Sequence, residues 1–164
     1  MDNKYVDRAK KIIDKILYIT IATVNKNGEP WNSPVYSAFD ENYNFYWASD
    51  QNGKHSKNIS ENENVFIVIY DSTAPEGTGE GVYIKAKTTV LTDNKEILHG
   101  LEVLDKRVGK TKERNENEFL DEYPRRVYKA TPEKVWVNDE GDVNGNYIDI
   151  RIEINLEDLK VPGR

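Results

Sequence analysis

The chain has 164 residues, a formal charge of −6 at neutral pH and no cysteine. A chain of this length is expected to form one domain, 1–164, with its own hydrophobic core. The lack of cysteine excludes disulfides, thiolate metal sites and cysteine nucleophiles, and the net negative charge argues against nucleic acid as a partner. The N-terminal residues hold no apolar run long enough for a signal peptide or a membrane span, so we expect a cytoplasmic protein without a membrane partner.

The first half of the sequence predicts one helix followed by a series of strands. Apolar residues recur at helical spacing over about 4–16, from Ala9 to Ile16. Stretches rich in β-branched and aromatic residues then predict strands over 17–24, 30–39, 44–49 and 65–71. Pro34 indicates an edge or a bulge in the second strand, and the nearly all-apolar fourth strand is expected to be central. The segment "HSKNISEN" predicts a short helix before it.

The second half adds three strands and a helical insertion. A glycine-rich loop leads into a strand over 82–92, residues 94–122 look helical, and strands follow at 125–138 and 147–154 with a hairpin loop at 139–145. Most connections are too short for the crossovers that parallel strands require. We therefore expect a mainly β (α+β) fold in which antiparallel strands close into a barrel with flanking helices.

The stretch "DQNGKHSKNI" places a small basic cluster in an acidic chain. Lys54, His55 and Lys57 follow Gly53 at the start of the predicted helix, with Ser56 among them. Free N–H groups at a helix N-terminus attract anions, and glycine allows a ligand to approach the backbone. A terminal phosphate is the expected ligand; the alternative is a solvated lysine-rich turn.

Three segments together resemble the pyridoxamine 5'-phosphate oxidase-like, flavin-binding split barrels. They are "GEPWNSPVYSAFDENYNFYWASDQNGKHSKNISENENVFIVIYD", "STAPEGTGEGVYIKAKTTVL" and "YKATPEKVWVND", and the resemblance covers roughly 10–155. It implies a six-stranded antiparallel split barrel that forms a homodimer. It also implies two FMN molecules bound in grooves between the subunits.

The resemblance also implies which residues hold the cofactor. The backbone of Pro34, Val35, Tyr36 and Ser37 would run beside the flavin ring, and Tyr46, Trp47, Ala48 and Ser49 would border the ring and ribityl chain. Lys54, His55, Ser56 and Lys57 would hold the phosphate, while Trp136 and residues near Gly81 would come from the other subunit. Ordinary core packing is the alternative for both tryptophans.

Departures from the family pattern bear on the substrate. Asn32 and Ser37 stand where the oxidase has an arginine and a lysine that grip phosphate, and "YIDIRIEI" offers only Arg151 for a substrate phosphate. The resemblance thus implies an FMN-dependent oxidoreductase with another small-molecule substrate than pyridoxamine 5'-phosphate. The alternative is a flavin- or deazaflavin-binding carrier or sensor without turnover. The sequence identifies no catalytic residue.

Other motifs carry little chemistry. His99 lies on an amphipathic helical stretch, and two histidines 44 positions apart predict no metal site. The run "GTGEG" precedes a strand instead of opening a helix, which is the wrong context for a dinucleotide fingerprint.

Overall fold

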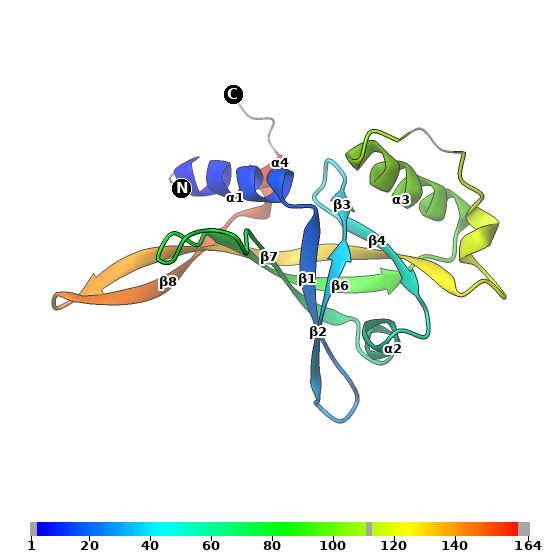
Figure 1. The fold of residues 1–164 in the computed structure, drawn as a ribbon, viewed down its shortest axis with the longest axis horizontal. Helices are drawn as coiled ribbons and strands as arrows, with labels where there is room; N and C mark the ends of the chain where they lie inside the picture. The colour runs from blue at the N-terminus through cyan, green and yellow to red at the C-terminus, as the bar shows by residue number, and fades with distance from the viewer. Residues whose placement is uncertain (1–2, 111–112, 161–164) are drawn as a thin grey trace.

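The computed structural model describes residues 3–110 and 113–160, in which strands predominate (Figure 1). The elements in chain order are α1 (Asn3–Lys15), β1 (Tyr18–Val24), β2 (Pro30–Tyr36), β3 (Ala38–Phe39), β4 (Phe45–Asp50), α2 (Lys54–Glu61), β5 (Asn64–Tyr70), β6 (Gly81–Val90), α3 (Asn94–Arg107), the 3-10 helix η1 (Glu116–Phe119), β7 (Arg125–Val143), β8 (Asn146–Ile154) and α4 (Leu156–Lys160). The predicted strands, the N-terminal helix and the short helix before β5 are confirmed within a few residues.

The strands form one antiparallel sheet that is split instead of closed. Its order is β2-β1-β5-β6-β7-β4-β3, with β8 paired to β7, so β5 is central as predicted. The expected second strand, 30–39, divides at Ser37: β2 pairs with β1 and β3 pairs with β4. The strands at the two ends of the sheet, β2 and β3, are thus continuous in the chain. No ladder of hydrogen bonds between β2 and β4 closes the barrel. The split barrel is confirmed with eight strands, and the expectation of a fully closed barrel is wrong.

Two features at the split follow from local sequence. Pro34 lies in β2, which pairs only with β1, and an edge strand tolerates a residue without an N–H. At the break, the Ser37 N–H donates to the Leu17 carbonyl (3.0 Å), which extends the β1–β2 register by one pair, and the next residue, Ala38, already pairs with Tyr46 of β4. The backbone between β2 and β3 is thereby turned from one neighbour to the other.

The helical insertion is shorter than predicted. Its first half forms α3, which Asp93 caps by accepting hydrogen bonds from the N–H groups of Lys95 and Glu96. The second predicted helix is wrong, because between Gly109, at φ +65°, and Arg125 only η1 is helical in the described residues. The stretch before Phe119 offers no apolar stripe that a helix could bury.

The C-terminal hairpin is longer than predicted and projects from the body of the molecule (Figure 1, orange). Beyond Val137, β7 pairs with β8 alone. The predicted loop at 139–145 is wrong, because the strands continue to a two-residue turn at Asn144 and Gly145 with φ of 55° and 79°. Two positive φ values are typical of the Asn-Gly hairpin turn. The short helix α4, which was not predicted, follows and buries Leu159.

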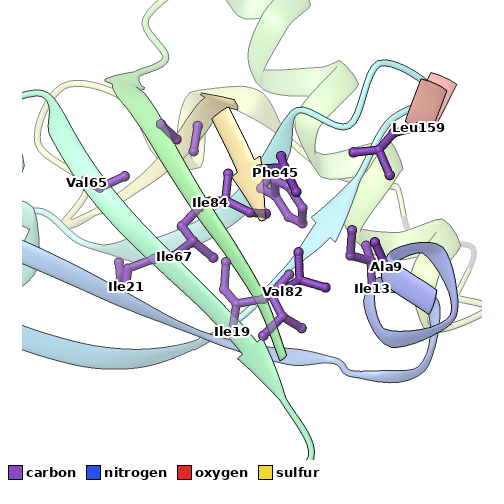
Figure 2. Packing of buried hydrophobic residues seen from close by; sticks show 14 of the residues in the cluster. Ala9, Ile13, Ile19, Ile21, Phe45, Val65, Ile67, Val82, Ile84 and Leu159 are labelled. Atoms are coloured by element: carbon purple, nitrogen blue, oxygen red, sulfur yellow. The ribbon is translucent and has the colours of Figure 1, made fainter. Parts of the chain in front are cut away.

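Two hydrophobic clusters hold the fold together. The larger fills the barrel, where inward residues of β1, β5 and β6 meet Phe45, and α1 adds Ala9 and Ile13 (Figure 2). The smaller lies between α3 and the outer side of β4 and β7. There a Cβ on Gly100 would come within 3.0 Å of Tyr46 and Val127. The glycine thus lets α3 pack closely against β4, beside the split.

Candidate functional site

A cleft of about 530 Å³ lies where β2 and β4 part. Its walls come from the strands beside the split, from α2, and from α3 with the segment that follows it. The lining residues are Tyr18, Pro34, Val35, Tyr36, Ala48, Ser49, His55, Leu101, Leu104, Asp105, Val108, Lys110, Arg114 and Arg125. The cleft therefore exists because the barrel is split there and because α3 covers one side of the opening.

Six of the residues predicted to hold a cofactor line this cleft. They are Pro34, Val35, Tyr36, Ala48, Ser49 and His55. The split brings them together from β2, β4 and α2, although they span more than twenty positions of the sequence. The structure thus shows one concave surface shared by the predicted ring, ribityl and phosphate segments.

Tyrosines form one wall of the cleft. The rings of Tyr18 and Tyr36 meet edge to face with centroids 6.0 Å apart. The Tyr36 hydroxyl donates to the Leu104 carbonyl of α3 (3.2 Å), which fixes the ring across the cleft. Because Tyr36 was expected to contribute mainly backbone, its side chain is an addition to the predicted site. A fixed aromatic wall suits a planar ligand.

His55 is the predicted phosphate residue that the structure places best. It follows Gly53 and Lys54 at the start of α2, lines the cleft, and keeps a buried Nε2 without a hydrogen-bond partner among the described residues. A buried polar atom without a partner is costly, so it is normally paired with water or a ligand. Burial also lowers the pKa of His55 below its ordinary value of 6.5. The imidazole is therefore poised to donate to or accept from a ligand as a neutral group.

We expect the half-buried His55 to make stability depend on pH. Because its folded pKa is lowered, the unfolded chain binds the proton more readily, and stability rises with pH across the window between the lowered pKa and about 6.5. The loss of melting temperature between about pH 7.5 and about pH 5.5 should therefore be smaller in His55→Gln than in the wild type. Ser60→Ala, at an exposed residue of the same helix without an ionisable side chain, is the control and should keep the wild-type loss. Parallel curves for wild type and His55→Gln would contradict this reading.

Cations from distant segments complete the cleft, and the sequence analysis missed them. Arg125 enters from β7, opposite Asp50 of β4, and Lys110 and Arg114 come from the segment after α3. Arg114 forms a bidentate ion pair with the buried Asp105, with Nε–Oδ2 at 2.8 Å and Nη2–Oδ1 at 2.5 Å. The cleft is thus a basic surface in an acidic chain. The sequence does not reveal this surface, because Lys110, Arg114 and Arg125 lie more than fifty positions after His55.

Three predicted residues are buried away from the cleft. Tyr46 packs under α3, and its hydroxyl donates to Asp40 Oδ2 (3.0 Å). Burial and Asp40 together hold the pKa of Tyr46 far above its ordinary value. Trp47 is fully buried in the barrel and stacks on Tyr128 at 5.6 Å. The Ser37 hydroxyl is also buried and donates to the Ala38 carbonyl (3.3 Å). These side chains belong to the core, so any role beside a cofactor falls to their backbone.

The remaining members of the basic cluster separate on α2. Lys54 and Lys57 are exposed and lie outside the lining of the cleft. Ser56 is buried and faces a different hollow, described below. Consecutive helical residues point about 100° apart, so a cluster that is compact in sequence cannot present every side chain to one ligand.

Trp136 lies on the outer face of the sheet, far from the cleft of its own chain. Directly opposed residues form one row across five strands: Pro34, Thr20, Val68, Tyr83 and Trp136. Four strand spacings of about 4.8 Å put Trp136 roughly 19 Å from Pro34 along this row. Trp136 stacks on Phe66 of β5, whose side chain is partly exposed. The predicted contact between Trp136 and a cofactor thus requires a second copy of the chain.

Arg151 does not contribute to the cleft. It lies on the projecting hairpin, pairs with Asp149 (2.5 Å) and covers the ring of Tyr83 at 4.3 Å. Its guanidinium thus pairs with a neighbour on the surface of the hairpin. In residues 3–110 and 113–160 we find no group of three potential metal ligands. No helix of the described chain has the length and apolar character needed to cross a membrane.

Comparison with protein-family models gives one match. The model described as pyridoxamine 5'-phosphate oxidase matches residues 6–139, which is most of the chain and includes every lining residue of the cleft. A comparison with curated proteins gives no match.

Solved structures share the fold at low sequence identity. A heme binding protein from Mycobacterium smegmatis has a TM-score of 0.67 at 15% identity, over 94% of this chain and 59% of that one. HutZ, a heme storage protein from Vibrio cholerae, has a TM-score of 0.66 at 15% identity, over 80% of this chain and 92% of that one. An F420 reductase has a TM-score of 0.56 at 18% identity, over 77% of this chain and 94% of that one. At these identities the likeness shows the fold alone.

Proposed function

Because the chain belongs to the pyridoxamine 5'-phosphate oxidase family, we propose that its cleft binds FMN and that the protein is an FMN-dependent oxidoreductase acting on a small molecule other than pyridoxamine 5'-phosphate. The observation that carries this proposal is the basic cleft at the split. The buried and unpartnered Nε2 of His55 and a fixed tyrosine wall belong to the same cleft. A flavin mononucleotide combines the two features that these walls suit, a planar ring and a terminal phosphate.

The residues present fit the two ends of such a ligand. In this proposal His55 and Arg125, which line the same cleft, bind the phosphate, and Ser49 is a further lining residue with a hydroxyl. Tyr18 and Tyr36 would face the ring, and the β2 backbone at Pro34 and Val35 would run along it. The flavin, when bound, supplies the redox chemistry. The chain would position the flavin, and Val35 and Leu104 would exclude water from one side of the cleft.

The direct test is to load the purified protein with FMN, desalt it, and record the flavin absorbance and the melting temperature. Bound flavin with a raised melting temperature is the expected result. Neither retained flavin nor stabilisation at a large excess of FMN would overturn the proposal. Mass spectrometry of the compound that co-purifies with the protein would identify a deazaflavin directly.

A second candidate is a carrier or sensor that holds FMN or a deazaflavin without turnover. Asp105 is the only carboxylate in the lining of the cleft, as far as the described residues show, and it is paired with Arg114. The Tyr36 hydroxyl is also engaged. Neither the Asp105 carboxylate nor the Tyr36 hydroxyl is thus free to donate a proton to a substrate. To separate the candidates, the bound flavin is reduced and electron acceptors are added; an enzyme should be reoxidised faster by one of them than by oxygen alone.

We expect a homodimer that uses the outer face of the sheet. The row that begins beside the cleft at Pro34 ends at Trp136, and Phe66 and Tyr70 are exposed next to it. A second copy seated there would cover aromatic surface and bring its own Trp136 toward the cleft. Phe66→Glu should shift the protein from dimer to monomer in light scattering, whereas Tyr123→Glu, at a half-exposed tyrosine before β7, should not. A monomeric wild type at micromolar concentration with flavin bound would refute the dimer.

We also expect no meaningful oxidation of pyridoxamine 5'-phosphate. That substrate carries a phosphate of its own. It needs a second cationic phosphate-binding site besides the one that holds FMN. Arg151 cannot supply it in this chain, because Asp149 pairs with its guanidinium outside the cleft. The assay follows pyridoxal 5'-phosphate formation by FMN-loaded protein in air. Robust turnover that is lost in Arg151→Ala would show that Arg151 does reach the substrate.

A further inference from the structure

A second hollow, of about 590 Å³, lies beside α2 and does not share a residue with the cleft. The helix turns His55 toward the cleft and Ser56, Ile59 and Ser60 toward the hollow. The C-terminal end of β6 and the start of β7 form the other walls. The lining residues are Gln51, Ser56, Ile59, Ser60, Thr88, Thr89, Val90, Thr92, Arg126 and Tyr128.

Two hydroxyls in this lining are buried. Ser56 is 3% exposed and Thr88 is 2% exposed. The Thr88 Oγ1 has no hydrogen-bond partner among the described residues, and the Ser56 hydroxyl lies beside the Tyr128 phenol. The Thr88 N–H is already used, since it donates to the Glu63 carbonyl (2.8 Å). Buried hydroxyls are nearly always paired with protein, water or a ligand. The unpaired Thr88 hydroxyl at this hollow, with the Ser56 hydroxyl also in the lining, therefore indicates a bound polar partner.

The charge of the hollow favours an anionic partner. Its lining contains no carboxylate, although the chain has 29 acidic residues. The Arg126 guanidinium donates to the backbone carbonyls of Asp121, Tyr123 and Arg125, so it is held in place. No ion pair with Arg126 is found in the described part of the chain, so its positive charge is not cancelled at close range. Burial raises the pKa of Tyr128, which keeps its phenol protonated.

We propose that this hollow binds the phosphate group of a small hydroxylated molecule, with Ser56 and Thr88 donating to phosphate oxygens and Arg126 supplying the charge. Hydrogen bonds from fixed donors to an ionised oxygen are the stronger kind. The remaining lining is neutral and rich in hydrogen-bonding groups, at Gln51, Ser60 and Thr92, which suits a hydroxylated ligand body. The site is separate from the proposed FMN cleft and does not depend on it.

The test titrates FMN-loaded protein with ribose 5-phosphate and, as the matched ligand without phosphate, with ribose. Calorimetry gives the affinity, and the fluorescence of Trp47, which stacks on Tyr128 of the hollow, gives an independent signal. We expect saturable binding of ribose 5-phosphate, at least about tenfold tighter than ribose, or about 1.4 kcal/mol.

Variants locate the binding. Thr88→Val keeps the shape and removes the hydroxyl, so it should weaken ribose 5-phosphate at least about tenfold while leaving the melting temperature of the ligand-free protein unchanged or higher. Ser56→Ala should weaken it similarly and serves if Thr88→Val fails to fold. Lys57→Gln, one residue away from Ser56 but exposed and outside the lining of both the hollow and the cleft, should leave this affinity unchanged.

Three outcomes would overturn the proposal. An absence of saturable binding would mean that water satisfies the two hydroxyls. Equal affinity for ribose and ribose 5-phosphate would mean that the hollow takes a neutral ligand. Binding that His55→Phe abolishes and Thr88→Val preserves would place the phosphate in the cleft instead.

Discussion

Replacing Trp47 with alanine is expected to lower the free energy of unfolding by about 3–5 kcal/mol, the usual cost of removing a large aromatic side chain from a packed core. Trp47 is fully buried, belongs to the cluster that fills the barrel, and stacks on Tyr128 with an interplanar angle of 9°. The surrounding strands are hydrogen-bonded into one sheet and cannot collapse fully into the space left behind. Urea denaturation at 25 °C, with and without FMN, measures the effect.

Trp47→Phe keeps the experiment informative if the alanine variant does not fold, because domains of this kind have only about 5–15 kcal/mol of stability to lose. Phenylalanine retains an aromatic ring and removes the indole Nε1–H, which is buried without a partner among the described residues. The cost should therefore be smaller than for alanine, and FMN affinity should stay near that of the wild type. Weakened FMN binding at unchanged stability would instead support the interpretation of Trp47 as a residue that borders the flavin.

The case of Trp47 shows why the sequence predicts strands better than it predicts which side chains meet a ligand. In "FYWAS" the residues alternate between the barrel interior and the outer side of β4, and usually one of these sides faces solvent. Here α3 covers the outer side, so Phe45, Tyr46 and Trp47 are all buried. That covering depends on Gly100 and on contacts between segments more than fifty positions apart, which no local pattern records.

The helices and strands themselves were largely predictable because their signals are local. Alternating β-branched residues predict β1 and β5, and the helical spacing from Ala9 to Ile16 predicts α1. The hairpin turn at Asn144 and Gly145 also has a local signal in the Asn-Gly pair. The acidic residues before it, Asp139, Glu140 and Asp142, are typical of a loop, whereas in the structure they occupy exposed or partly exposed positions of β7.

The basic character of the cleft could not be predicted in the same way. Pairing of β4 with β7 places Arg125 opposite Asp50, which brings it near His55 from seventy positions away. The sequence indicated that the phosphate grip is weak, because Asn32 and Ser37 replace two cations of the family. In the structure Arg125 of β7 lies in the same cleft. The absence of the two family cations therefore does not by itself argue against phosphate binding.

Removing both His55 and Arg125 should weaken FMN binding at least about a hundredfold. A hydrogen bond to an ionised group contributes about 1.5–3 kcal/mol, and a tenfold loss of affinity requires only about 1.4 kcal/mol. His55→Phe keeps a planar ring without donors, and Arg125→Met keeps most of the apolar stem without charge. Each single change should cost at least about tenfold, and the two need not add exactly because they share one ligand group.

Riboflavin separates loss of the phosphate contact from general damage to the cleft. It has the same ring and ribityl chain without the phosphate, so the double variant should bind it nearly as well as the wild type does. Lys57→Gln, at an exposed residue of α2 outside the lining of the cleft, is the matched control for loss of one cation and should bind FMN almost normally. Equal losses for FMN and riboflavin would mean that the phosphate does not lie at His55 and Arg125. A large loss of FMN affinity in Lys57→Gln alone would instead indicate that the phosphate binds on the exposed side of α2, as the basic cluster in the sequence predicts.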